Sequence, residues 1–74
     1  MEGFREREAN FMVVAAIEGY SHRHGLSTKE TYWRFRIHNV IHMLRDNYDE
    51  LKAQSIDQYI DFCEDILRRN GYGE

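Results

Sequence analysis

The sequence predicts a compact all-α domain made of four or five short helices. The chain contains no proline, so no residue forbids a helix interior. Two segments, Ser27-Thr28-Lys29-Glu30 and Ser55-Ile56-Asp57-Gln58, have the spacing of a capping box. In a capping box, a serine and a Glu or Gln three residues later bond the first free backbone N–H groups of a helix. Apolar residues recur at helical spacing behind the second box, which indicates a packed amphipathic helix.

Length and composition limit the size of this domain. We expect residues 1–74 to form a single domain with frayed ends at about 1–4 and 71–74. A chain this short buries only about 60% of the surface that its unfolded form exposes, so its core is marginal. The hydrophobic content of 42% is nevertheless too high for a disordered chain. The longest apolar run, residues 11–17, is much shorter than the roughly 20 residues that span a bilayer, so we expect no membrane association. A single cysteine fits a reducing compartment, so we expect a cytoplasmic protein.

The first helix is expected from about Arg5 to His24. Its apolar residues cover nearly the whole circumference over two turns, which is typical of a helix that is central or covered on two sides. These residues are Phe11, Met12, Val13, Val14, Ala15, Ala16, Ile17 and Tyr20. Gly25 suits the left-handed position that ends a helix, whereas Gly19 weakens the helix interior.

The next helical segment follows the first capping box and is expected to divide. Its apolar residues fall into two registers that one straight helix cannot bury together. The larger register comprises Trp33, Ile37, Val40, Ile41 and Leu44, and the smaller one comprises Tyr32 and Phe35. A bend near His38 or Asn39 would allow two short helices to use both sets. After a further break, Asp49 is expected to cap a short turn over residues 50–54.

The last helix carries the clearest apolar stripe of the chain. Its members are Ile56, Tyr59, Ile60, Cys63, Ile66 and Leu67. The helix is expected to begin after Ser55 and to end at Gly71, with Arg68 and Arg69 where cations suit the exposed carbonyls. Because the lone cysteine, Cys63, lies within the stripe, we expect a buried and unreactive thiol.

Charge is distributed unevenly along the chain, although the net charge is only −3. The segment from residue 28 to residue 45 is basic, with a single acid, Glu30. Its cations are Lys29, Arg34, Arg36 and Arg45. From residue 46 onward, eight acidic residues oppose three basic ones. The basic segment could meet an anionic partner, or it could face the acidic C-terminal helix of its own chain or of a second copy.

Nucleic-acid binding, by a small regulator similar to a helix-turn-helix protein, is one alternative function. The run Trp33-Arg34-Phe35-Arg36 interleaves aromatic rings with guanidinium groups, which suit base stacking and phosphate pairing. The contacts would come from Lys29, Arg34, Arg36 and Arg45. Four cations next to an acidic segment give only a weak positive potential for binding phosphates, so this function is the second choice.

The polar residues do not form a catalytic motif. His38 and His42 have the i, i+4 spacing of two metal ligands, but two arginines on the same polar side of the helix would repel a metal. Asp61, Glu64 and Asp65 are expected to form the solvated acidic face of the last helix. We therefore expect no enzyme activity, no metal site and no cofactor.

A series of hydrophobic and capping positions extends from about Phe11 to Leu67. They are Ile17-Glu18 with Tyr20, Leu26-Ser27 with Glu30 and Tyr32, Val40-Ile41, Tyr48-Asp49 with Leu51, Gln54-Ser55, Tyr59-Ile60 and Asp65-Ile66. Their order resembles a family of short bacterial proteins known as domain of unknown function 3791 (DUF3791). One departure is Lys52, at a position where the family is expected to have a histidine, so any role of that histidine does not transfer.

The resemblance implies a small accessory protein, because some members of that family are encoded beside proteins similar to ADP-ribosyltransferases. It further implies that this chain is the non-catalytic, antitoxin-like or scaffolding member of such a pair. That implication comes from association and not from a residue of the chain.

We expect a protein-interaction module, and self-association as a homodimer is its first form. A second copy would supply the burial that a small core lacks. The candidate contact residues are Phe11, Met12 and Val14 on the first helix, with Tyr32, Trp33, Arg34 and Arg36 on the second.

Overall fold

The computed structural model describes residues 2–71, apart from the side chains of residues 2, 4 and 5, and this part of the chain consists of helices joined by short turns, with no strand. The helices are α1 (Glu2–His24), α2 (Thr28–Ile37), α3 (Val40–Asp46), α4 (Tyr48–Leu51) and α5 (Ile56–Arg69). The all-α prediction is therefore confirmed. Residues 72–74 of the expected frayed C-terminus, and Met1 at the other end, lie outside the described residues. None of these helices is long and apolar enough to cross a membrane.

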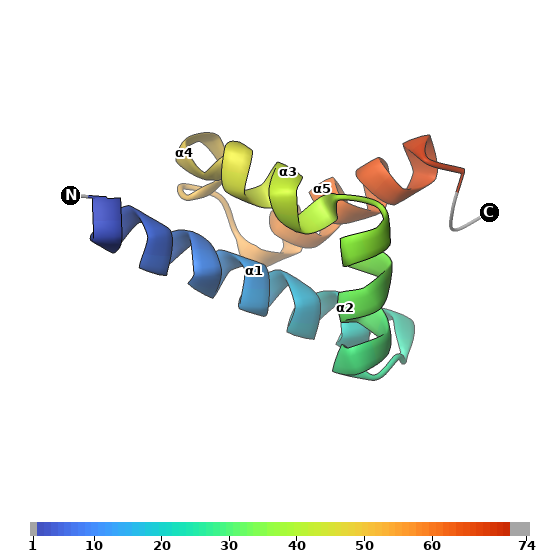
Figure 1. Cartoon of the computed structure of the whole chain (residues 1–74). Helices are drawn as coiled ribbons and strands as arrows, with labels where there is room; N and C mark the ends of the chain where they lie inside the picture. Colours follow the sequence, from blue (N-terminus) through green and yellow to red (C-terminus); the bar gives the residue numbers. More distant parts are fainter. Residues whose placement is uncertain (1, 72–74) are drawn as a thin grey trace.

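The longest helix, α1, forms one side of the fold. In Figure 1, α3, α4 and α5 lie on the same side of α1, and α2 lies across the C-terminal end of α1. The helix α1 packs against α5, α2 and α3, and α3 also packs against α2, α4 and α5. The opposite side of α1 therefore carries no helix of the part of the chain that the structure describes.

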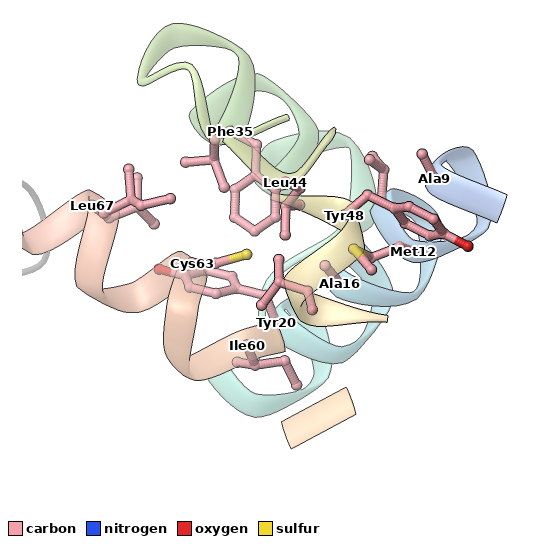
Figure 2. Packing of buried hydrophobic residues seen from close by; sticks show 14 residues of the cluster. Ala9, Met12, Ala16, Tyr20, Phe35, Leu44, Tyr48, Ile60, Cys63 and Leu67 are labelled. Atoms are coloured by element: carbon pink, nitrogen blue, oxygen red, sulfur yellow. The ribbon is translucent and has the colours of Figure 1, made fainter. Parts of the chain in front are cut away.

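One hydrophobic core joins all five helices, and Figure 2 shows its side chains converging between them. The buried residues are Ala9, Met12, Val13, Ala16, Tyr20, Phe35, Val40, Leu44, Tyr48, Leu51, Ile60, Cys63, Ile66 and Leu67. Phe35 is the largest fully buried side chain among the described residues, and the Tyr20 ring meets it edge to face at 5.2 Å. Such edge contacts between aromatic rings add about 0.5–1.5 kcal/mol beyond area burial.

The helix α1 is buried on one face only, so the expectation of a central or doubly covered helix is wrong. Met12 and Ala16 are buried, whereas Phe11 is 72% exposed and Val14 is 51% exposed. The apolar run at 11–17 covers both faces of the helix, but the rest of the chain supplies enough apolar surface to cover only one. An apolar outer face is the result.

The expected bend between α2 and α3 is confirmed at Asn39, whose φ of 61° is left-handed. The predicted registers are wrong, because Phe35 is fully buried while Trp33 is half exposed and Ile37 is 72% exposed. The left-handed residue resets the helical phase, so α2 and α3 do not have to share one stripe. Thr31, which is polar, takes the second buried position of α2.

The short helix α4 begins after Asn47, not after Asp49 as expected. The Asn47 side chain makes no N-cap hydrogen bond to α4. Instead it donates to the Met43 carbonyl at 2.9 Å, and the same carbonyl also accepts the Asn47 backbone N–H at 3.1 Å, so Asn47 closes the end of α3. Tyr48 and Leu51 are buried, and they hold this single turn against the core.

The helix α5 begins at the predicted capping box. The Ser55 N–H donates to Gln58 Oε1 at 2.9 Å, and the Gln58 N–H donates to Ser55 Oγ at 3.3 Å. The helix ends at Arg69, and Gly71 follows with a φ of 79°, a left-handed value that suits glycine. Of the predicted stripe only Ile56, the first residue of the helix, is substantially exposed.

Candidate protein-interaction surface

Six large apolar side chains are exposed on the described part of the chain. They are Phe11, Val14, Tyr32, Trp33, Ile37 and Ile56. Single exposed apolar residues are normal, but a contiguous group on a small protein marks an interaction surface.

Two shallow hollows connect four of the six. The first hollow lies between α1 and α2, and Val14, Ile17 and Tyr32 line it together with Glu18, Thr28 and Lys29. The second hollow lies between α1, α4 and α5. Its lining is Glu8, Phe11, Met12, Ala15, Tyr48, Lys52, Ile56 and Tyr59. Phe11 and Val14 are one turn apart on α1, so the two hollows join into one surface, which we call the outer α1 strip: Phe11, Val14, Tyr32 and Ile56.

A separate group of side chains surrounds Trp33 on α2. The Tyr32 and Trp33 rings meet at 5.6 Å with planes inclined by 70°. The Arg36 guanidinium lies 5.9 Å from the Trp33 ring, and its Nη1 donates to the Tyr32 hydroxyl at 3.0 Å. Three predicted contact residues are thus held together before any partner binds, with Tyr32 shared between this group and the outer α1 strip.

Two other predicted contact residues, Met12 and Arg34, are not part of these surface groups. Met12 is only 4% exposed and belongs to the core, so its expected role as a surface contact needs correction. Arg34 lies partly buried on the other side of α2, where Nη2 contacts Glu30 Oε2 at 3.5 Å. Ile56, which sequence reasoning assigned to a buried stripe, is instead part of the surface. The helical spacing of Ile56 is the same as that of the buried stripe residues, so the sequence pattern did not indicate that Ile56 is exposed.

Three of the four cations proposed for nucleic-acid contact have no ion pair among the side chains that the structure describes. They are Lys29, Arg36 and Arg45. The Arg45 guanidinium donates to the neutral Asn10 side chain. Arg36 and Arg45 line one groove between α1, α2 and α3, together with Tyr32, Asn39 and His42. Arg34, the fourth cation, contacts Glu30 instead.

The acidic face of α5 meets the end of α1 and not the basic segment of α2 and α3. Arg23 Nη1 lies 2.9 Å from Asp61 Oδ1 and 3.2 Å from Glu64 Oε2, and Nη2 lies 3.4 Å from Asp57 Oδ1. The hydrogen bond to Asp61 is the main reason why the pKa of Arg23 is raised. His24 Nε2 lies 2.8 Å from Glu64 Oε2. The basic segment therefore does not neutralise this acidic helix within one chain.

The candidate metal ligands are not brought together into a site. His42 Nε2 lies 3.1 Å from Asp46 Oδ2 in an exposed i, i+4 pair. Within residues 2–71, no three His, Cys, Asp or Glu side chains are grouped closely enough to hold a metal ion. Cys63 is fully buried, and that burial raises the pKa of its thiol from 9.0 to about 12, which keeps it neutral and unreactive.

Comparison with known proteins gives a family but no characterised relative. No curated protein and no solved structure matches the chain. The family model described as "Protein of unknown function (DUF3791)" matches residues 11–70, which contain α2 to α5 and the greater part of α1. The chain therefore belongs to the DUF3791 family.

Proposed function

We propose that this chain is a non-catalytic protein-interaction module and that it binds its partner through the outer α1 strip. The observation that supports this proposal is the exposure of Phe11 and Val14 on a helix face that no other element within residues 2–71 covers. Both side chains are held on a regular helix, so binding would cost little ordering of the backbone. The charged residues at the margin, Glu18 and Lys29, form a polar rim of the kind that surrounds protein interfaces.

Self-association is the first form of this proposal. Full burial of a Phe or Val side chain contributes roughly 1.5–3 kcal/mol. Four such side chains, two from each copy, would contribute at most about 12 kcal/mol, whereas association costs about 4–15 kcal/mol. The balance leads us to expect a weak dimer whose population depends on protein concentration.

Size-exclusion chromatography with light scattering tests this form on a concentration series of the full chain. Phe11→Ser should shift the series toward monomer. Ile37→Ser is the matched control, because Ile37 is also 72% exposed but lies outside the outer α1 strip. A mass that stays monomeric at the highest concentration, or equal effects of both variants, would overturn self-association through this strip.

Binding to a different protein is the second form of the same proposal. The resemblance to DUF3791 implies a neighbouring protein similar to an ADP-ribosyltransferase, for which this chain would be an antitoxin-like or accessory partner. Affinity capture of the tagged chain from its host, after nuclease treatment and at moderate salt, tests this form. Stoichiometric recovery of the neighbouring gene product by the wild type, and its loss with Phe11→Ser but not with Ile37→Ser, would support it.

Nucleic-acid binding is a second candidate function, and one observation favours it. Lys29, Arg36 and Arg45 carry charges that no described carboxylate neutralises, and Arg36 and Arg45 share one groove. Binding through phosphates weakens steeply as salt rises. If the chain shifts no DNA or RNA probe even at low salt, this function is excluded. If it does bind, Arg45→Gln should weaken binding to all sequences alike.

A further inference from the structure

The exposed face of α1 has a symmetric arrangement of four side chains. Arg7, Phe11, Val14 and Glu18 are all exposed, and their separations along the helix are four, three and four residues. At 3.6 residues per turn these four positions fall within about 60° of one another around the helix. The spacing therefore reads the same from either end of the helix, with two apolar residues in the middle, a positive charge at one end and a negative charge at the other.

Such an arrangement is complementary to itself when two copies run in opposite directions. A closed dimer with two-fold symmetry needs a surface in which residue i meets residue j while j meets i. In an antiparallel pair centred between Met12 and Val13, Phe11 of one copy faces Val14 of the other. The same operation brings Arg7 of each copy to Glu18 of the other, so both ends of the pair gain opposite charges.

The two charges cannot satisfy each other within one chain. Arg7 and Glu18 are separated by eleven residues, which is about 16 Å along an α-helix and beyond the reach of a salt bridge. Among the side chains that the structure describes, neither of them has an ion-pair partner, whereas Arg23, Arg68 and Arg69 are paired with acids of α5. A second copy would supply the missing partner for both.

We propose that two copies of this chain associate through antiparallel α1 helices, with Phe11 packed on Val14 and Arg7 paired with Glu18 across the two-fold axis. This inference rests on self-association as proposed above, and it adds the direction, the register and the charge pairs. Tyr32 flanks the contact from α2 and Ile56 flanks it from α5, so both sides of the helix pair are closed by apolar groups.

Charge reversal tests the register by sedimentation equilibrium of the full chain at low salt. Arg7→Glu and Glu18→Arg each place like charges at both ends of the pair, so each should weaken the dimer by about tenfold. The double variant Arg7→Glu/Glu18→Arg exchanges the charges and should restore wild-type dimerisation. The two single variants, mixed, should form a heterodimer, because every end of that pair again joins opposite charges.

Matched controls separate the register from general charge effects and from folding. Arg68→Glu and Glu50→Arg make the same charge changes at exposed positions away from α1, and they should leave the dimer constant within about twofold. Circular dichroism checks that each variant remains helical.

Two outcomes would overturn the inference, and they are distinguishable. The register would be overturned, and self-association would stand, if the wild type dimerises and no charge reversal changes the dimer constant. The same conclusion follows if the single variants weaken the dimer and the double variant does not restore it. A wild-type chain that remains monomeric at every concentration would overturn self-association as well.

Discussion

Gly19 of α1 lies against Ile60 of α5 at a distance that leaves no room for a side chain. A Cβ atom on Gly19 would lie 2.6 Å from Ile60 Cδ1 and 3.2 Å from Ile60 Cγ1. Ile60 is only 3% exposed, so the surrounding core limits how far its end can move. A glycine that weakens the helix as a local element therefore permits the closest approach of the two longest helices.

Gly19→Ala tests this close approach. Alanine gains about 1 kcal/mol of helix propensity, but overpacking costs about 1–3 kcal/mol, so we expect a net loss of about 1 kcal/mol in the free energy of unfolding. In the background of Ile60→Val, which removes the Cδ1 atom, the same substitution should become neutral or stabilising. Urea denaturation of the four proteins in this cycle measures the coupling. Equal effects of Gly19→Ala in both backgrounds would contradict the proposed contact.

A buried pair of hydroxyls joins α1 to α2. Ser21 Oγ donates to the Ile17 carbonyl at 2.7 Å and lies 2.6 Å from Thr31 Oγ1. Because the carbonyl can only accept, Ser21 uses its one proton there, and the Thr31 hydroxyl supplies the proton of the contact between the side chains. Thr31 is fully buried, so its hydroxyl depends on Ser21.

This direction of bonding leads to unequal effects of two substitutions. Ser21→Ala leaves the Thr31 hydroxyl buried without its acceptor and should cost about 1–3 kcal/mol. Thr31→Val keeps the shape of the side chain and leaves Ser21 bonded to Ile17, so it should cost less than Ser21→Ala. Thermal and urea unfolding measure both values. A larger loss of unfolding free energy for Thr31→Val than for Ser21→Ala would contradict the assigned direction, in which the Thr31 hydroxyl donates to Ser21.

The left-handed residue at the bend between α2 and α3 gives a third prediction. A left-handed conformation costs residues with a Cβ roughly 1–2 kcal/mol, and Asn tolerates it better than most. Asn39→Ala should therefore lower the free energy of unfolding by about 1 kcal/mol, whereas Asn39→Gly should be neutral or stabilising. Chemical denaturation measures the difference between the two variants. Equal values would show that the backbone at residue 39 relaxes out of the left-handed region.

The buried thiol predicts how stability changes at alkaline pH. The pKa of Cys63 is raised in the folded chain from 9.0 to about 12, so the unfolded chain ionises first. Stability from this group is complete below pH 9 and is lost as the pH rises toward 12, by up to about 1.4 kcal/mol per pH unit. The slope of unfolding free energy against pH should therefore be steeper for the wild type than for Cys63→Ala. Parallel slopes would contradict the raised pKa.

Local signals in the sequence predicted where α2 and α5 begin, but not where α4 begins. The capping box at Ser55 needs only residues three positions apart. The bend near Asn39 was expected from the two apolar registers, but its left-handed conformation was not predicted. The burial of Cys63 followed from a stripe with one clear period. In each case the deciding interactions lie within one helix or at its end.

The side of each helix that becomes buried was predicted less well. In α2, Phe35 and Trp33 are both aromatic, and the choice of Phe35 for the core depends on packing between helices, including its contact with Tyr20 of α1. In α1, the apolar run has two equivalent faces, so the sequence alone did not separate Met12 from Phe11. The candidate surface depends on these choices, because it consists of the apolar side chains that the core leaves out.

Nuclear magnetic resonance of the ¹⁵N-labelled chain over a dilution series tests the central claim most directly, because it maps the contact surface residue by residue. We expect concentration-dependent shifts at the amides of Phe11, Val14 and Glu18, with smaller ones at Tyr32, and constant shifts along the outer face of α5. Shifts centred on Trp33 and Ile37, or no shifts at any concentration, would contradict self-association through the exposed face of α1.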